Sequence, residues 1–222
     1  MQREVIAFFD VDHTISRRAT ALAFILICMK RGYIKWWYLA ATPLLYIFYR
    51  LFNLKIDIIY RMGLPKLIGL SRSVFEDIGR EAFEKYLKNN LYPGALREMD
   101  ALRARGIRVI LATSTPFDAV YPLAQYCGIS ASDVIATQFA YTGGAFDGRL
   151  IGVPVFSRNK CSIILSFAQS SGIDLHLCSF YSDSIHDLPL LEKVGHPVAA
   201  NPDHRLRRIA DKRGWTVKDF SK

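Results

Sequence analysis

The feature that most constrains the fold is an apolar run, Val5–Phe9, that ends directly in Asp10-Val11-Asp12-His13-Thr14. A short, continuous apolar run is typical of a strand buried on both faces of a parallel sheet. Open parallel sheets bind their ligands at the carboxyl ends of their strands, where Asp10 and Asp12 are expected to lie. Acidic pairs at strand ends also occur as simple turn residues, so this motif has functional meaning only with partners elsewhere in the chain.

Two further apolar runs end in polar residues that could be such partners. The run Arg108–Ala112 leads into Thr113-Ser114-Thr115-Pro116, a cluster of hydroxyls before a predicted helix. The run Leu175–Tyr181 leads into a segment that holds Asp183 and Asp187. Hydroxyls and free backbone N–H groups before a helix are suited to binding phosphate. The sequence therefore predicts that acids and a phosphate-binding loop meet at one edge of a sheet.

The order of these residues resembles the haloacid dehalogenase superfamily, in its phosphoserine-phosphatase-like subfamily IB. The resemblance rests on D-x-D-x-T at Asp10, a strand ending in Thr113, Lys160 at the start of a helical stretch, and S-D-S-x-x-D around Asp183. It implies an α/β fold with a doubly wound, Rossmann-like parallel sheet and an inserted, C1-type α-helical cap. The expected domains are a catalytic core of residues 1–16 plus 91–222 and a cap of residues 17–90.

The chemistry of an anionic phosphate ester agrees with this resemblance. A carboxylate that attacks a phosphate needs a divalent cation to reduce the repulsion between them, and Mg²⁺ suits oxygen ligands. Asp10 is expected to attack phosphorus and form an aspartyl-phosphate intermediate. The resemblance implies that Asp10, Asp183 and the backbone carbonyl of Asp12 hold Mg²⁺.

Asp12 is predicted to act as the general acid and base of the reaction. An acid two residues after the nucleophile can protonate the departing alkoxide and then activate the water that cleaves the acyl phosphate. This favours a phosphatase or a phosphomutase, of which hydrolysis is the simpler reaction. Thr113, Ser114 and Lys160 are predicted to bind the phosphate.

Three more residues near these positions have supporting or open roles. Thr14 is expected to brace the nucleophile loop, and Asp187 to orient the site through Lys160. His13 is either an exposed loop residue or a contact to the substrate or cap, and the sequence leaves both readings open.

Composition limits the other classes of function. Half of the residues are apolar, which excludes a disordered chain. The net charge of +9 suits an anionic substrate, an anionic membrane or a nucleic acid, but neither a zinc-ligand spacing nor an aromatic RNA-binding motif is present, so nucleic-acid binding is not expected. Four scattered cysteines and the absence of a signal-peptide pattern predict a cytoplasmic protein.

The first part of the predicted cap is unusually apolar and basic. No acidic residue occurs between Asp12 and Asp57, and basic residues flank the apolar runs Ala19–Met29 and 36–49. Both runs are too short to span a bilayer. They could pack together as a helical cap, or the cap could contact the inner face of the cell membrane peripherally, with Trp36, Trp37 and Tyr38 at headgroup depth on anionic lipid.

The cap is expected to select the substrate. Phosphoserine hydrolases of this family place Glu nine residues after the nucleophile, where this chain has Ala19 beside Arg17 and Arg18. An apolar, basic entrance, similar to that of lipid phosphatases of the family, favours an amphiphilic phosphate such as phosphatidylglycerophosphate or a lysophospholipid. Phosphoserine or another small phosphometabolite is the alternative, and a non-catalytic membrane-binding homologue is a remote one. No obligate protein partner is evident.

Overall fold

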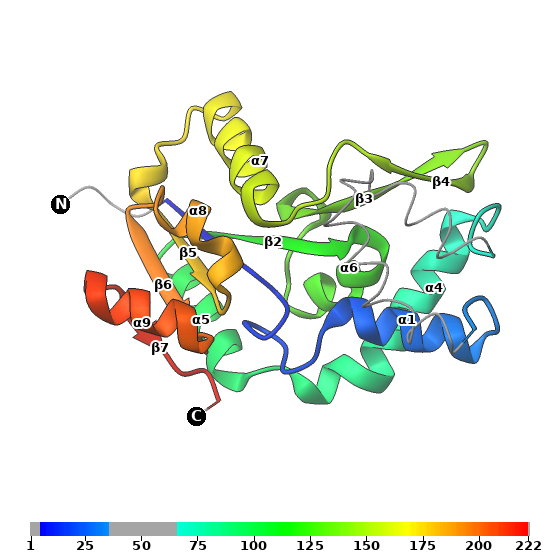
Figure 1. Ribbon diagram of the computed structural model, residues 1–222, viewed down its shortest axis with the longest axis horizontal. Coiled ribbons are helices and arrows are strands. Elements are labelled where there is room, and N and C mark those ends of the chain that lie inside the picture. Colours follow the sequence, from blue (N-terminus) through cyan, green and yellow to red (C-terminus); the bar gives the residue numbers. More distant parts are fainter. Residues whose placement is uncertain (1–4, 36–65, 222) are drawn as a thin grey trace.

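The computed structural model describes residues 5–35 and 66–221. Within these ranges the strands form one seven-stranded sheet in the order β4-β3-β2-β1-β5-β6-β7 (Figure 1). The strands are β1 (Ile6–Phe9), β2 (Arg108–Pro116), β3 (Val134–Thr142), β4 (Ala145–Ile151), β5 (Cys178–Ser182), β6 (His196–Ala200) and β7 (Thr216–Lys218). Neighbouring strands are parallel, except that β3 and β4 form an antiparallel hairpin. The expected doubly wound α/β fold is confirmed.

Helices cover both faces of this sheet. The α-helices are α1 (Thr20–Lys30), α4 (Arg72–Ala82), α5 (Pro93–Ala104), α6 (Phe117–Tyr126), α7 (Ser157–Ser170), α8 (Leu188–Leu191) and α9 (His204–Arg213). The shorter turns are the π-helical η1 (Phe83–Leu87) and the 3₁₀-helical η2 (Lys88–Asn90), η3 (Ala131–Asp133), η4 (Leu175–Leu177) and η5 (Ile185–Asp187).

Strand β1 lies in the middle of the sheet and contributes to the cores on both faces. Ala7 and Phe9 belong to the apolar cluster that holds α1, α4, α5 and α6, whereas Ile6 and Phe8 belong to the cluster under α7, α8 and α9. This alternation follows from the two-residue period of a strand. Because both faces are covered, only the strand ends remain for a ligand.

The described part of the predicted cap packs onto the core. Phe75 of α4 lies between the ring of Phe24 in α1 and the rings of Phe139 and Phe146 in the β3–β4 hairpin, at centroid distances of 6.1, 5.3 and 5.4 Å. The apolar run Ala19–Met29 thus buries Phe24, Ile27 and Cys28 inside the protein. The predicted membrane residues Trp36, Trp37 and Tyr38 lie outside the described residues.

Across residues 5–35 and 66–221, every helix lacks the length or the apolar character needed to cross a membrane.

Two strands differ in extent from the sequence-based expectation. β2 continues through Thr113 to Pro116, with an irregular register against β3 after Thr113. The run Leu175–Tyr181 is a 3₁₀ turn followed by β5, because the Asp174 carboxylate accepts a hydrogen bond from the His176 N–H and favours the turn.

Candidate active site

Asp10, Lys160 and Asp187 form a buried ionic cluster at the carboxyl edge of the sheet. Asp10 follows β1, and its N–H continues the pairing with β5 by donating to the Tyr181 carbonyl at 2.9 Å. Lys160, on the first turn of α7, places its Nζ 2.8 Å from Asp10 Oδ1 and 2.8 Å from Asp187 Oδ2. The Ser182 hydroxyl also donates to Asp187 Oδ2, at 2.8 Å. Two acids that follow separate strands and a lysine at the start of a helix therefore meet in space.

The electrostatics of this cluster show an excess of negative charge. Burial raises the pKa of the Asp10 carboxyl to about 8; Lys160 opposes this rise, and Asp187 and Asp12 add to it. Burial would lower the pKa of the Lys160 ammonium, but Asp10 and Asp187 together raise that pKa above its ordinary value. Burial also raises the pKa of Asp183 to about 6, with His13 opposing and Asp187 adding to the shift. One lysine does not neutralise this group of acids.

The donor atoms fit the expected Mg²⁺. Within the described residues, no three His, Cys, Asp or Glu side chains come together as a metal-binding group. The expected ligand set needs only two side-chain carboxylates, of Asp10 and Asp183, together with a backbone carbonyl, water and phosphate oxygens. Burial raises the pKa of both carboxyls, so a divalent cation bound between them would favour their ionised forms.

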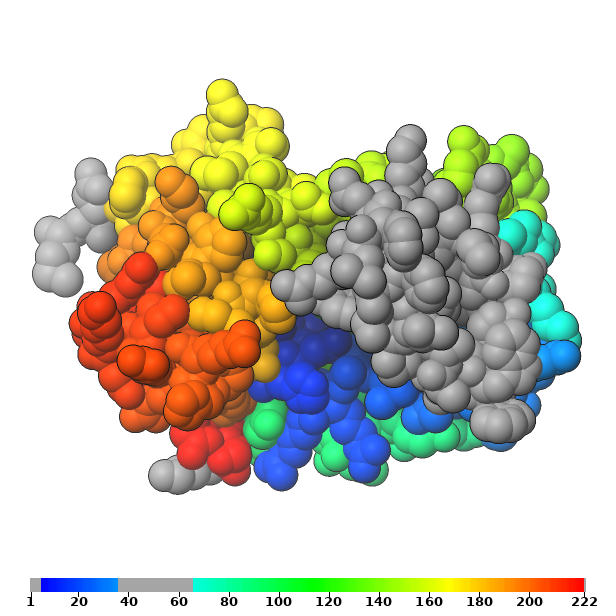
Figure 2. Space-filling view, viewed as in Figure 1, coloured from blue at the N-terminus to red at the C-terminus, as the bar shows by residue number. Residues whose placement is uncertain are grey.

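The loop after β1 is tied to the loops after β5 and β6. The Asp183 N–H donates to Thr14 Oγ1 at 3.0 Å, and Asn201 Nδ2 donates to the His13 carbonyl at 3.1 Å. Figure 2 shows the blue N-terminal segment beside the orange segment that follows β5. Sequence reasoning missed Asn201, which directly follows β6 and adopts a left-handed turn conformation that Asn tolerates.

Backbone strain is concentrated in this region. Among the described non-glycine residues, His13, Ser157 and Asn201 have positive φ angles, of 60°, 51° and 47°. His13 follows the acidic motif, Ser157 begins α7 three residues before Lys160, and Asn201 holds His13. Such conformations persist only where the surroundings enforce them, and they occur often at functional sites.

The carboxylate of Asp12 contacts two threonines, Thr20 and Thr115. The Thr20 N–H donates to Asp12 Oδ1 at 2.8 Å, the Thr20 hydroxyl donates to the same oxygen, and the Thr115 hydroxyl lies 3.4 Å from Asp12 Oδ2. Sequence reasoning missed Thr20, because nothing in the helical pattern relates a residue at the start of α1 to an acid eight positions earlier.

The predicted phosphate-binding residues lie at the end of β2. Phe9, the last residue of β1, pairs with Leu111 of β2. Thr113 follows Leu111 along β2, so it lies at the same edge of the sheet as the acidic motif. Thr113 is buried, with its hydroxyl accepting the Thr115 N–H at 3.2 Å, and Ser114 is exposed. The carbonyl of Ser114 accepts the Thr137 hydroxyl at 2.8 Å, which secures this segment.

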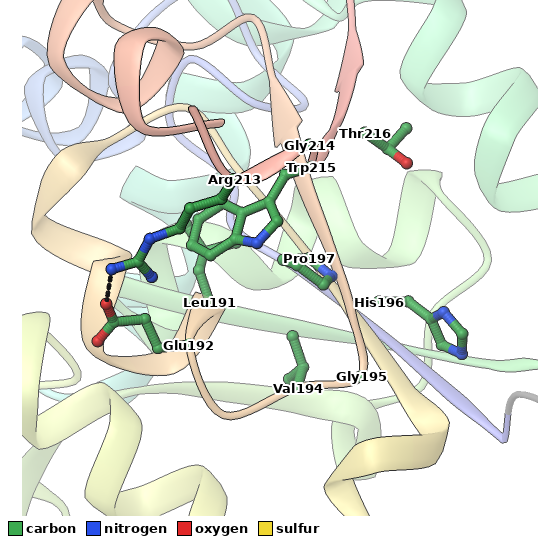
Figure 3. Close-up of a pocket in the computed structure, with 10 residues that line it drawn as sticks. All are labelled: Leu191, Glu192, Val194, Gly195, His196, Pro197, Arg213, Gly214, Trp215 and Thr216. Carbon is green, nitrogen blue, oxygen red and sulfur yellow. Dashed lines mark ion pairs between the residues drawn. The ribbon is translucent and has the colours of Figure 1, made fainter. Parts of the chain in front are cut away.

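A pocket of about 520 Å³ lies away from these residues. It is lined by the beginnings of β6 and β7 and by the end of α9, including His196, Trp215 and Arg213 (Figure 3). Since β6 is parallel to β5, this pocket is at the amino edge of the sheet, opposite the acidic cluster.

Comparison with known proteins agrees with the geometry. Residues 7–192 match the model of the haloacid dehalogenase-like hydrolase family. A Mycobacterium tuberculosis protein named phosphoserine phosphatase is 30% identical over 96% of this chain and 70% of its own length. A histidinol-phosphatase of Neisseria meningitidis is 29% identical over 97% of this chain and 98% of its own.

A solved structure shows the same architecture. A protein of unknown function from Bordetella pertussis superimposes with a TM-score of 0.84 and 28% identity, over 99% of this chain and 100% of the other. The chain belongs to the haloacid dehalogenase-like hydrolases, in which it is a phosphomonoester hydrolase of the phosphoserine-phosphatase-like kind.

Proposed function

We propose that this chain hydrolyses phosphate monoesters in two steps, with Asp10 as the nucleophile and Mg²⁺ as the cofactor. The observation that carries this proposal is the buried contact of 2.8 Å between Lys160 Nζ and Asp10 Oδ1. A lysine that orients a carboxylate, and is itself held by Asp187, leaves the Asp10 side chain little freedom to turn away from a substrate. Asp10 attacks phosphorus, the ester oxygen leaves, and an aspartyl phosphate forms.

The other predicted residues then have distinct tasks. Asp12 donates a proton to the leaving oxygen and later accepts one from the attacking water. Thr113, Ser114 and Lys160 stabilise the charge on the phosphoryl oxygens, and Thr14 and Asp187 hold the loops in place. Asp10, Asp183 and the Asp12 carbonyl would hold Mg²⁺, which would neutralise charge on the phosphate as a Lewis acid.

We further propose the division into a core of residues 1–16 plus 91–222 and a cap of residues 17–90. The two segments that connect the proposed core and cap lie side by side, which supports this division. The Arg17 N–H donates to the Asn90 carbonyl at 2.8 Å, and the Tyr92 N–H donates to the Ile15 carbonyl at 2.8 Å. An inserted domain enters and leaves its host at neighbouring points of this kind.

The substrate we propose is a small phosphorylated metabolite. Two relatives that cover nearly all of this chain are named for phosphoserine and histidinol phosphate, both small phosphate monoesters. An amphiphilic lipid phosphate, with peripheral membrane contact through the cap, is the second candidate, because the segment from Arg17 to Lys55 is apolar and basic without any acid.

Phosphate release from a panel of substrates tests these proposals. The panel contains phosphoserine, histidinol phosphate, a lysophosphatidate and phosphatidylglycerophosphate, each measured with Mg²⁺ and with EDTA. Rapid quenching of the wild-type enzyme should trap phosphate on Asp10, and Asp10→Asn should release none. Undiminished turnover by Asp10→Asn would refute the nucleophile, and no turnover of any ester would favour a non-catalytic membrane-binding protein.

Sedimentation with anionic vesicles separates the two substrate classes further. The comparison is between the wild type and a variant with Trp36→Ser, Trp37→Ser and Tyr38→Ser. Equal recovery of both proteins in the supernatant would count against the lipid substrate.

A further inference from the structure

The carboxylate of Asp12 is held by Thr20, the first residue of α1, and by Thr115, near the end of β2. We propose that Thr20 and Thr115 are positioning residues that orient Asp12 toward the leaving group. Through Thr20, the placement of α1 then controls the proton-transfer step. The inference rests on the proposed function, since it takes Asp12 as the general acid and base.

Thr20 makes two of the contacts with Asp12. It is the first residue of α1, where backbone N–H groups have no partner within the helix, and its N–H is used by Asp12 Oδ1 at 2.8 Å. Its hydroxyl contacts the same carboxylate oxygen. A hydrogen bond from both the backbone and the side chain of one residue sets the direction as well as the distance of Asp12.

Thr115 places a second hydroxyl beside the same carboxylate. Its Oγ1 lies 2.7 Å from Thr20 Oγ1 and 3.4 Å from Asp12 Oδ2, so both carboxylate oxygens have a hydroxyl neighbour. Thr20 is 0% and Thr115 1% exposed, so solvent does not compete for these hydroxyls. Buried hydrogen bonds of this kind hold one rotamer where exposed ones would allow several.

The two threonines are braced against each other through α4. Thr115 is followed by α6, and α4 crosses α6 so closely that a Cβ on Gly79 would lie 2.1 Å from the Asp118 carbonyl oxygen. On its other side, α4 meets α1 through the Phe24–Phe75 ring pair and through an ion pair of 2.7 Å between Arg31 and Glu81. A shift of α1 relative to β2 therefore has to break packing contacts as well as the hold on Asp12.

The dependence of the rate on the leaving group distinguishes a positioning role of Thr20 and Thr115 from a general structural role. An alkoxide is a poor leaving group and needs a proton from Asp12, whereas p-nitrophenolate leaves without one. Disturbing the orientation of Asp12 should thus slow the phosphorylation of Asp10 by an alkyl phosphate far more than by p-nitrophenyl phosphate. Loss of folded protein would lower both rates alike.

The experiment compares the rate of the phosphorylation half-reaction for phosphoserine, or whichever alkyl ester the substrate panel selects, with that for p-nitrophenyl phosphate. Thr20→Val removes the hydroxyl at nearly constant shape, Thr20→Ser retains it, and Thr115→Val is a second, independent disruption. For each Val variant we expect the phosphorylation rate with the alkyl ester to fall about tenfold or more, and the rate with the nitrophenyl ester to fall less than about threefold. The loss with the alkyl ester is part of the roughly 10²–10⁴-fold rate increase that a positioned acid contributes. Thr20→Ser should restore most of the loss.

Three outcomes decide between the explanations. An equal loss with both esters, or no loss with either, would overturn the positioning role of the threonines. Should Thr20→Val fail to fold, Thr115→Val answers the same question. Asp12→Asn serves as the reference variant. If its rate loss does not depend on the leaving group, the assignment of Asp12 as the general acid fails. If only the threonine variants lack this dependence, the positioning role fails and the assignment of Asp12 stands.

Discussion

Lys160 Nζ lies 2.8 Å from Asp10 Oδ1, although the two residues are 150 positions apart in the sequence. Lys160 is only 3% exposed, and its second partner, Asp187, is equally buried. A cation shared by two buried carboxylates is the main compensation for their charge, because neither acid has water to solvate it. The position of the nucleophile and the stability of the fold therefore depend on the same ammonium group.

Replacing Lys160 by Met should reduce both activity and stability. The change leaves Asp10 and Asp187 buried without their cation, which costs about 3 kcal/mol or more of unfolding free energy at pH 8 in EDTA. The cost should be smaller at pH 5, where the buried carboxyls take up protons. Urea unfolding at the two pH values measures this, with Lys193→Met on an exposed position as the control. An unfolding free energy that Lys160→Met leaves unchanged would show that the ion pairs are not important for stability.

The raised pKa values of Asp10 and Asp183 predict how stability depends on pH. Between about pH 4 and 8 the folded protein binds more protons than the unfolded chain, because these pKa values are about 8 and 6 when folded against 3.8 when unfolded. In EDTA the unfolding free energy should thus fall as the pH rises through this window. Lys160 remains charged throughout and adds no slope. The total change is several kcal/mol, since a change of one in a pKa corresponds to about 1.4 kcal/mol.

Mg²⁺ should oppose this loss. A cation bound by ionised Asp10 and Asp183 displaces their protons, so its stabilising effect is larger at pH 8 than at pH 5.5. Thermal unfolding with and without Mg²⁺ at both pH values is the measurement. Asp10→Asn is the matched control, and it should remove the part of the pH dependence between pH 6 and 8. A Mg²⁺ effect that is the same at both pH values would contradict the proposed ligand set.

The sheet and the polar residues at its strand ends could be predicted because they follow from local patterns. Each of Asp10, Thr113 and Asp183 comes directly after a run of buried apolar residues, and parallel strands bring such positions to one edge. Lys160 needed the family resemblance, since a lone lysine near the start of a helix has no pattern of its own. In the structure its ammonium nitrogen lies 2.8 Å from a carboxylate oxygen of Asp10 and 2.8 Å from one of Asp187.

The contacts of Asp12 and His13 could not be predicted in the same way. Thr20 reaches Asp12 only because the chain turns between residues 13 and 19, and no periodic pattern describes that turn. Asn201 holds the His13 carbonyl across 188 positions of sequence through a side-chain amide, which leaves no hydrophobic signature. Contacts between irregular loops depend on the finished fold, whereas strand ends are visible in the sequence.

The crossing of α4 and α6 predicts a large effect from adding one methyl group. Gly79→Ala would place a Cβ 2.1 Å from the Asp118 carbonyl oxygen, and 3.3 Å from the Ala119 Cα. Because both neighbours are backbone atoms, the helices must move apart, and we expect a loss of about 2 kcal/mol or more. Asp77→Ala on the exposed face of α4 should change the stability by less than about 0.5 kcal/mol. Chemical denaturation compares the two, and an equally stable Gly79→Ala would show that this crossing can relax.

The pocket at the amino edge of the sheet should affect stability and leave catalysis intact. The Arg213 guanidinium lies 5.1 Å from the centroid of the Trp215 ring and 2.6 Å from Glu192 Oε1. Figure 3 marks the ion pair of Arg213 with Glu192 by a dashed line. Trp215 packs against the apolar cluster under α9, so Trp215→Ala should cost about 2 kcal/mol, less than the cost at a fully buried site. Asp10 and Asp183 lie at the carboxyl ends of their strands, at the edge of the sheet opposite this pocket. At temperatures below its lowered Tm, Trp215→Ala should therefore keep kcat and KM within about twofold of the wild-type values. Arg208→Ala, on the exposed side of α9, is the control, and a change in KM specific to Trp215→Ala would instead connect this pocket to the substrate.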